Sequence, residues 1–352
     1  METELVYAEE EMANEAIAKA VEYLDDGSVV ALPTETVYGL GANALDAEAV
    51  AKVFEAKGRP SFDPLIIHLS NREEIHRYCD LSPELNDIVQ KLIENFWPGP
   101  LTMVLPKKDI IPDIVTSGLS TVAVRMSGHP IMQEICKKFG KPIAAPSANR
   151  FGRISPTSAG AVLKELDGKI PLIIDGGACN AGLESTIIRV ELGENKPELH
   201  LLRAGPVVKE DLQKIGKVIR PKKLTERARQ KLKEAGDQQA MQAPGMLDCH
   251  YAPSVPLYFL DKPEDFKPQE DKSYALLSYR GQAKDGYMDL YDWDVVEELS
   301  PGKGKLAEAS VRLFHVLRML DESGVDAIVA EPVSETGLGV AINDRLRRAS
   351  KR

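Results

Sequence analysis

The chain has 352 residues, of which 43% are hydrophobic, and its formal net charge at pH 7 is -10. This composition supports a buried core and a length of roughly two domains, and it excludes a disordered chain. The acidic balance also argues against a protein that coats nucleic acid over its whole surface.

Cysteine usage and hydropathy indicate the compartment. The four cysteines are widely spaced and include no C-x-x-C pair, which argues against a zinc site or a disulfide framework and suits a reducing cytosol. The first residues lack the basic-then-apolar order of a signal peptide, and no apolar run approaches the ~20 residues that span a bilayer. We therefore expect a cytoplasmic protein with no membrane partner.

Hydrophobic periodicity predicts interleaved helices and strands over residues 1–206. Helices are expected at 11–25, 46–56, 72–78, 82–95, 130–139 and 157–166. Strands are expected at 28–32, 65–69, 101–105, 121–125, 142–145, 171–174, 186–191 and 199–202. This order is typical of an α/β domain with an open, twisted and mixed sheet.

The composition changes after Gly205-Pro206. Residues 207–254 read as a linker, with a basic stretch of one or two exposed helices from Lys209 to about Ala240. From 255 to 352 the alternation restarts and predicts a second, smaller α/β domain of Rossmann-like type. Its expected strands are 256–260, 273–278 and 326–330, and its expected helices are 306–320 and 340–349.

Two cations lie on a short loop between the helix at 46–56 and the strand at 65–69. Gly58 allows the backbone to turn between Lys57 and Arg59, and Pro60 prevents the helix from resuming. An anion bound between the two cations would remove their repulsion, and a polyphosphate fits that role. The alternative is a solvated helix C-terminus, where both cations merely offset the helix dipole.

Polar loops follow several other expected strands, which is where α/β sheets bind ligands. Pro33 to Gly39 carries two hydroxyls and a carboxylate that could bind a ligand. The alternative is that the segment is an ordinary turn capped by its threonines. Arg125 ends a strand and could clamp a carboxylate, or be solvated. The loop from Ala144 to Thr157 combines hydroxyl, amide and guanidinium groups at a density that favours function. The absence of G-x-x-x-x-G-K-[ST], G-x-S-x-G and H-E-x-x-H motifs leaves Walker loops, covalent serine chemistry and zinc hydrolysis without support.

Five motifs now stand in one order along the chain: Pro33–Gly41, Lys57–Pro60, Phe96–Thr102, Pro146–Asn149 and Gly182–Thr186. With them, and with His250–Pro253 and Ala341–Leu346, the chain closely resembles the threonylcarbamoyl-AMP synthases in their two-domain form, whose catalytic half is the YrdC domain. The resemblance implies that L-threonine, bicarbonate or CO2, and ATP give threonylcarbamoyl-AMP and pyrophosphate, with Mg²⁺. A partner transferase would then modify tRNA, so that this chain would meet tRNA only indirectly.

The resemblance also implies roles for individual residues. The expected catalytic residues are Lys57, Arg59, Ser147 and Asn149, and none is expected to bind a metal as a dedicated ligand. The expected contacts to L-threonine are Thr36, His68, Arg125, Ser147 and Ser185. The expected contacts to ATP are Lys57, Arg59, Asp63, Thr121, Asn149, Ser155, Arg203 and Tyr251. Tyr251 lies on a segment, Gly245 to Pro253, that would fold over the site and exclude water.

Two other functions remain open. The first is an RNA-binding module, against which the overall acidity and the lack of stacking aromatics among the basic residues both count. The second is carbamoyl adenylation from carbamoyl phosphate, as in hydrogenase maturation proteins that share the domain. Those proteins carry zinc-finger cysteines and an acylphosphatase region, which this sequence lacks.

Overall fold

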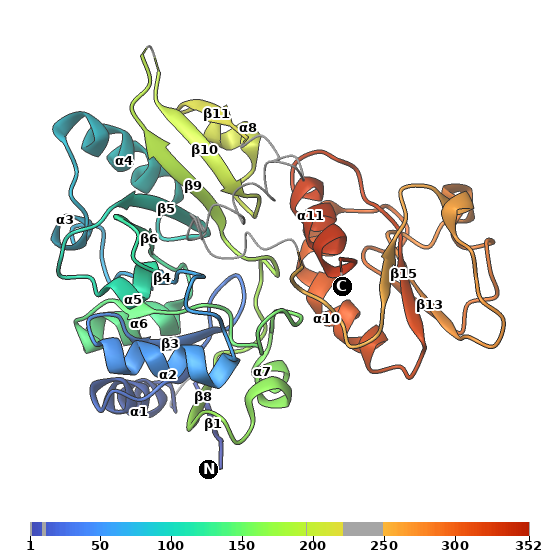
Figure 1. Ribbon diagram of the computed structural model, residues 1–352, viewed down its shortest axis with the longest axis horizontal. Coiled ribbons are helices and arrows are strands. Elements are labelled where there is room, and N and C mark those ends of the chain that lie inside the picture. The colour runs from blue at the N-terminus through green and yellow to red at the C-terminus, as the bar shows by residue number, and fades with distance from the viewer. Residues whose placement is uncertain (1, 9–11, 195, 221–248, 352) are drawn as a thin grey trace, which may run out of the picture.

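The computed structural model describes residues 2–8, 12–194, 196–220 and 249–351 (Figure 1). These residues form an 11-stranded mixed sheet and a separate 4-stranded parallel sheet, both packed with helices. The predicted α/β class is therefore confirmed. Within the described ranges, no helix has both the length and the apolar character needed to cross a membrane.

The large sheet contains the strands of the first 219 residues. They are β1 (Glu4–Tyr7), β2 (Val30–Leu32), β3 (Gly39–Asn43), β4 (Ile66–His68), β5 (Leu101–Pro106), β6 (Thr121–Arg125), β7 (Ile143–Ala144), β8 (Leu172–Asp175), β9 (Thr186–Glu191), β10 (Glu198–Arg203) and β11 (Lys217–Ile219). Their order across the sheet is β1-β8-β2-β3-β7-β4-β6-β5-β9-β10-β11. The sheet combines parallel pairs, such as β4 with β6, and antiparallel pairs, such as β5 with β6.

Helices cover both faces of this sheet. They are α1 (Ala13–Asp25), α2 (Ala47–Lys57), α3 (Ile75–Tyr78), α4 (Pro83–Phe96), α5 (Asp113–Thr116), α6 (Pro130–Phe139), α7 (Ala159–Leu166) and α8 (Lys209–Leu212). Successive residues of β2 point to opposite faces: Val30 and Leu32 belong to the buried cluster of α1 and α6, and Ala31 belongs to the cluster that includes α2, α4 and α7. Such two-sided burial explains why the strand reads as a continuous apolar run.

Sequence patterns missed several elements, among them β1, β3, α5 and β14. The strand β3 has the sequence Gly-Leu-Gly-Ala-Asn, whose glycines hide its strand character. Gly41 is required there because a Cβ would lie 2.9 Å from both Ile143 and Leu32. The helix expected at 72–78 is shorter, since α3 covers only Ile75–Tyr78.

The predicted linker begins with ordered structure. The basic stretch opens with the single-turn helix α8, and β11 then joins the edge of the large sheet beside β10. The remainder of the predicted basic helices, residues 221–248, lies outside the described residues. The division of the chain at residues 206 and 255 stays a prediction.

The C-terminal sheet has the order β12-β15-β13-β14. Its strands are β12 (Leu257–Phe259), β13 (Tyr274–Ser278), β14 (Val295–Glu298) and β15 (Ala327–Ala330), and its helices are α10 (Leu306–Asp321), α11 (Gly339–Ala349) and the 3₁₀ turns η2 (Pro263–Asp265) and η3 (Ala283–Asp285). Figure 1 shows α10 and α11 between this sheet and the larger body. The two helices are therefore the elements that meet the large-sheet part of the chain.

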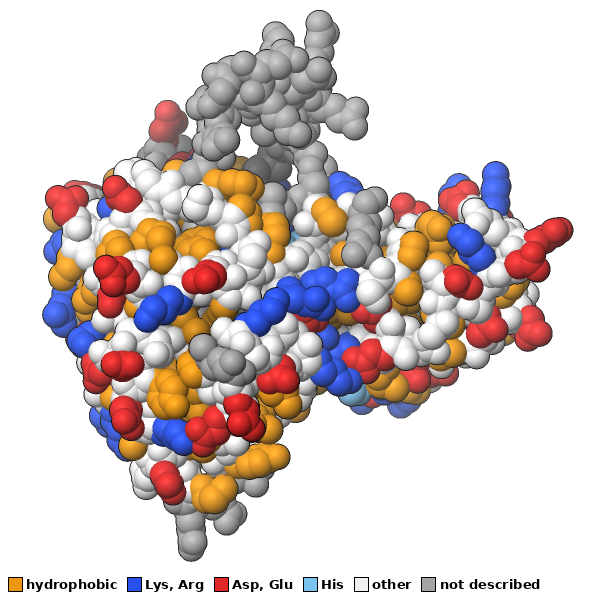
Figure 2. All heavy atoms as spheres, turned by 60° about the horizontal axis from the view of Figure 1, so that its bottom comes forward, with side chains coloured by type: hydrophobic (Ala, Val, Ile, Leu, Met, Phe, Trp, Pro, Cys, Tyr) orange, Lys and Arg blue, Asp and Glu red, His pale blue; other side chains and the backbone are white. Residues whose placement is uncertain are grey.

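An apolar core and ion pairs join the two parts. Val37, Ile154 and Leu183 of the large-sheet part belong to the same buried cluster as Leu313 and Phe314 of α10. Around this core, ion pairs cross the junction: Arg318 with Glu165 at 3.0 Å, Arg153 with Asp321 at 3.1 Å, and Lys164 with Glu322 at 2.6 Å. Figure 2 shows basic side chains gathered where the larger and smaller bodies meet.

Candidate active site

The lysine of the predicted cationic loop is held by the second polar loop. Lys57 ends α2, and Gly58 follows with φ 61°, the left-handed conformation that suits glycine. The buried Nζ of Lys57 donates to the carbonyl oxygens of Ser147, at 2.5 Å, and of Asn149. Burial, and next the charge of Arg59, hold the pKa of Lys57 well below its usual value. The two loops that the sequence singled out are therefore brought together.

Arg59 is fixed by its own loop. Its Nη2 lies 2.9 Å from Oδ2 of the fully buried Asp63, and its Nε and Nη2 donate to the carbonyl oxygens of Asp63 and Pro64. Asp63 was predicted as a nucleotide contact, and here it contacts Arg59. Its contact with a nucleotide stays a prediction.

The loop after β2 and the end of β6 form an ion pair that sequence reasoning missed. Arg125 donates from Nη1 to Thr36 Oγ1 at 2.9 Å, and its Nη2 lies 2.7 Å from Glu35 Oε1. The hydroxyl of Ser127 donates to the other carboxylate oxygen of Glu35. Burial opposes ionisation of Glu35, but Arg125 and Ser127 outweigh it and lower the pKa of Glu35 to about 2. Glu35 is therefore ionised at neutral pH and keeps Arg125 in place.

Ser185 and Arg203, expected to contact threonine and ATP respectively, contact each other beside this pair. Arg203 donates from Nε to the Ser185 carbonyl oxygen at 3.0 Å and from Nη2 to the Ser185 hydroxyl at 3.1 Å. The Ser185 hydroxyl also lies 2.8 Å from Thr102 Oγ1, a contact that was not predicted. His68 ends β4 nearby, and burial, then Arg125, lower its pKa to about 3, so that its imidazole is neutral.

The polar loop after β7 supplies the remaining predicted groups. The amide of Asn149 donates to the carbonyl oxygens of Arg150 and Arg153, and its buried Oδ1 has no partner among the described residues. Ser155 donates to Glu184 Oε1 at 2.6 Å. Asn149 thus keeps one acceptor for a ligand, and Ser155 is oriented by a carboxylate that the sequence did not single out.

One cavity unites most of these groups. Of the predicted residues, Thr36, Arg59, His68, Arg125, Ser147, Ser185 and Arg203 line it, together with unpredicted residues that include Thr34, Glu184 and His250. Lys57, Asp63, Asn149 and Ser155 contact its lining residues or the same loops. Thr121 lies at the opposite end of β6 from Arg125, so the structure does not bring it to this cavity wall.

The segment before the C-terminal sheet closes one side of the cavity. His250 lines the cavity, and Tyr251 is fully buried with φ 65° and packs 4.1 Å from the His250 ring. Burial, and next the charges of Arg59 and Lys57, hold the pKa of His250 well below its usual value. His250 and Tyr251 belong to the segment, Gly245 to Pro253, that was expected to fold over the site, and Tyr251 packs there against Phe314 of α10, with ring centroids 5.5 Å apart.

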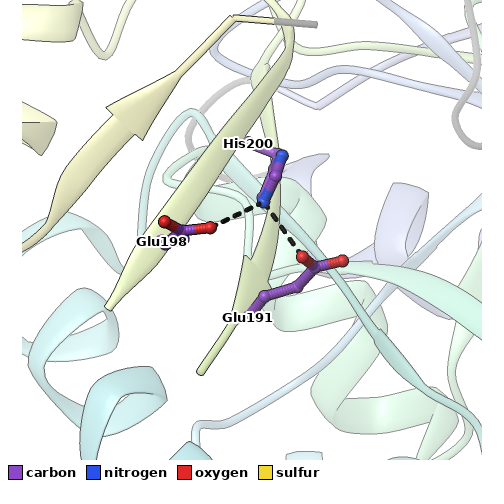
Figure 3. Close-up of side chains that lie close together, drawn as sticks. All are labelled: Glu191, Glu198 and His200. Atoms are coloured by element: carbon purple, nitrogen blue, oxygen red, sulfur yellow. Dashed lines mark ion pairs between the residues drawn. The ribbon is translucent and has the colours of Figure 1, made fainter. Parts of the chain in front are cut away.

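A second group of ionisable side chains lies away from the cavity, on β9 and β10. Within the described part of the chain, Glu191, Glu198 and His200 are the group whose ligand atoms lie close enough to share a metal ion (Figure 3). Both carboxylates already have cationic partners, Arg189 at 2.7 Å from Glu191 and Lys217 at 2.9 Å from Glu198. These ion pairs balance the carboxylate charge, so the group is best described as a surface ion-pair network.

The chain matches known proteins over both of its parts. The family model described as "Telomere recombination" matches residues 22–205, and the one described as "Threonylcarbamoyl-AMP synthase, C-terminal domain" matches residues 207–351. Over 351 residues the chain is 41% identical to the threonylcarbamoyl-AMP synthase of Pyrococcus abyssi, covering 99% of this chain and 98% of that protein. It is 38% identical over 343 residues to the protein of the same name from Bacillus subtilis, covering 95% and 92%.

The fold agrees with a solved relative. The crystal structure of P. abyssi Sua5 complexed with L-threonine superposes with a TM-score of 0.82 at 38% identity, covering 99% of this chain and 98% of that one. The sequence resemblance and the two-sheet architecture thus lead to the same family. The chain belongs to the family of two-domain threonylcarbamoyl-AMP synthases.

Proposed function

We propose that this cavity makes threonylcarbamoyl-AMP from L-threonine, bicarbonate or CO2, and ATP, with release of pyrophosphate. The observation that carries the proposal is that Arg59, Arg125 and Arg203 line one small cavity that also presents hydroxyls, with Lys57 bonded to its lining residue Ser147. A polyphosphate and an amino-acid carboxylate are the anions that such a cavity accommodates together. The related P. abyssi structure complexed with L-threonine supports the amino-acid half.

Threonine would lie against Arg125. The carboxylate would bind the guanidinium of Arg125, whose orientation Glu35 and Thr36 fix. His68 and Ser185 would complete the pocket, and the neutral imidazole of His68 adds no competing charge. Discrimination between threonine and serine would rest on contact with one methyl group. Such a contact contributes only ~1–3 kcal/mol to the difference in binding free energy.

ATP would occupy the side of Lys57 and Arg59. The amine of threonine takes up CO2 and loses a proton to give a carbamate, whose oxygen attacks the α-phosphorus while pyrophosphate leaves. Because an anion attacks an anion, the reaction requires cations and positioning, and no protein nucleophile. Lys57 and Arg59 would neutralise the phosphates, and Ser147, Asn149 and Ser155 would orient oxygens around them.

Mg²⁺ fits the residues present as an ion held mainly by the phosphates. The carboxylates of Glu35 and Asp63 are already paired with arginines, whereas the buried Asn149 Oδ1 has no hydrogen-bond partner among the described residues. Asn149 would contribute one ligand, and the ion would add charge neutralisation at the phosphates. The product would pass to a transferase that modifies tRNA. The cytoplasmic location of the protein stays a prediction.

Analysis of nucleotide products tests the proposal. With ATP, Mg²⁺ and bicarbonate, threonine should release pyrophosphate and yield threonylcarbamoyl-AMP, and Lys57→Ala or Arg59→Ala should lower the rate by about 100-fold or more. Lys52→Ala is a matched control on the same helix, because Lys52 is exposed and bonds only the Gly27 carbonyl oxygen. ATP that stays intact with threonine but is consumed with carbamoyl phosphate would replace this proposal with carbamoyl adenylation.

A further inference from the structure

A buried arginine of the C-terminal helix reaches the wall of the active-site cavity. Arg345 on α11 is fully buried, and its Nε donates to Glu184 Oε2 at 3.0 Å. The two residues are 161 positions apart in the chain, so this bond joins the C-terminal part to the large-sheet part. Glu184 lines the cavity and is followed by Ser185.

Glu184 connects this arginine to the nucleotide side. Its other oxygen, Oε1, accepts the hydroxyl of Ser155 at 2.6 Å. Glu184 is buried and accepts from Arg345 on one oxygen and from Ser155 on the other, so its position depends on both partners. A carboxylate at the wall of a polyphosphate site repels the phosphates unless a cation neutralises it.

The surrounding packing holds Arg345 in one place. Its guanidinium carbon lies 5.3 Å from the centre of the Tyr251 ring, and its Nη1 lies 3.0 Å from Asp344. Close by, the segment that carries Glu184 is pressed against α10, because a Cβ on Gly182 would lie 2.4 Å from the backbone of Ser310 and Val311. There is thus little room for Glu184 to move without Arg345.

One nitrogen of Arg345 remains available. Its buried Nη2 has no hydrogen-bond partner within the described ranges, and neither has the buried Tyr251 hydroxyl beside it. Buried donors without partners are uncommon in proteins and are often satisfied by a ligand or water. The C-terminal part therefore reaches the cavity through the bond from Arg345 to Glu184, in addition to covering it with His250.

We propose that Arg345 is a positioning residue of the active site, which neutralises Glu184 and thereby fixes the side chain of Ser155, whose hydroxyl donates to Glu184, on the side of the bound nucleotide. The proposal rests on the proposed function only in taking ATP as the ligand on the Ser155 side. It gives the C-terminal domain a defined contribution to nucleotide binding. Arg345 itself acts through Glu184.

The test compares nucleotide binding by Arg345→Met, Arg345→Lys, Glu184→Gln and the double variant Arg345→Met with Glu184→Gln. Calorimetric titration of the full chain with Mg²⁺ and a non-hydrolysable ATP analogue gives the affinity. Arg345→Met should weaken nucleotide binding roughly tenfold or more, because it leaves a buried carboxylate unpaired beside the phosphates. Arg345→Lys should recover part of the loss, and threonine affinity should change by less than about twofold.

The double variant separates this role from a structural one. Glu184→Gln removes the charge but keeps an oxygen for the Ser155 hydroxyl, so it should restore nucleotide affinity to Arg345→Met. Arg347→Met is the matched control on α11, since Arg347 is only partly buried and pairs with Glu335 instead of Glu184. We expect it to bind nucleotide as the unaltered chain does.

Other results would overturn the inference. If the double variant bound nucleotide no better than Arg345→Met, or if threonine and nucleotide affinities fell equally, Arg345 would be a structural residue. If Arg345→Met failed to fold, the test would use Arg345→Lys, which keeps the positive charge, and Glu184→Gln, which keeps the size of the side chain. A chain that binds the ATP analogue but makes no threonylcarbamoyl-AMP would refute the proposed function and leave this comparison of affinities intact.

Discussion

The buried pair of Glu35 and Arg125 should make the stability of this protein depend on acid in a defined way. Replacing Glu35 by glutamine keeps the size of the side chain and an acceptor for Ser127, but removes the charge that Arg125 faces at 2.7 Å. Glu35→Gln should therefore be less stable than the unaltered chain at neutral pH, and the deficit should disappear in acid.

The size of the effect follows from the pKa of Glu35. That pKa is about 2 in the folded chain and 4.5 for an unperturbed glutamate, and both side chains are nearly fully buried. At about 1.4 kcal/mol per pKa unit, the difference is on the order of 3 kcal/mol. Because folding lowers the pKa, this stability is complete above pH 4.5 and is lost as the pH falls toward 2. A change of that size corresponds to roughly 6–12 °C in melting temperature for a domain of about 150–250 residues.

Thermal unfolding from pH 7 down to pH 2.5 measures the difference between the two proteins. Asp25→Asn is the control, because Asp25 pairs with Lys141 on the surface and should contribute only about 0–1 kcal/mol. The melting-temperature gap for Glu35→Gln should be largest at pH 7 and shrink steadily below pH 4.5. A gap that is independent of pH would show that the ionisation of Glu35 is not what stabilises the fold.

Two further substitutions test the Arg59–Asp63 ion pair and the junction between the two parts of the chain. Asp63→Asn leaves the buried Arg59 without its carboxylate, and should lower the free energy of unfolding by about 3–5 kcal/mol. An unchanged midpoint of urea unfolding would contradict this. Gly182→Ala places a Cβ 2.4 Å from the backbone of α10 at a residue with φ +69°, and should loosen the junction, measured as faster proteolysis between the two parts. Gly177→Ala, with φ +86° and open space around its Cβ position, is the control and should leave proteolysis nearly unchanged.

The fold class, and the loops that line the cavity, could be predicted because local sequence patterns encode them, whereas the roles of the site residues stay predictions. Apolar runs followed by polar loops located the strand ends, and the motifs around Lys57 and Ser147 identified two loops that meet in space through a hydrogen bond. The strand β3 was not predicted, because its glycines allow close packing but do not give the alternating apolar pattern of a strand.

The partners of the site residues could not be predicted from local sequence. Glu35 lies 90 residues from Arg125, and Glu184 lies 161 residues from Arg345, so no periodicity relates them. A lone carboxylate in the Pro33–Gly39 loop is equally compatible with a turn. Only the burial of both members of each pair shows that one must neutralise the other.

The two cations of the Lys57–Arg59 loop differ in their electrostatic situation. Arg59 is paired with Asp63, and its guanidinium is held by both a backbone carbonyl oxygen and the carboxylate. In the proposed function it therefore mainly fixes the orientation of the bound phosphates. The hydrogen-bond partners of Lys57 are two neutral carbonyl oxygens, which orient its ammonium group without cancelling the charge. Among the described residues Lys57 bonds no counter-ion, so its burial makes the charge costly in the free protein, as its lowered pKa indicates. A phosphate that arrived there would relieve this cost, so the attraction for the nucleotide should arise chiefly at Lys57, and the geometry of binding at Arg59.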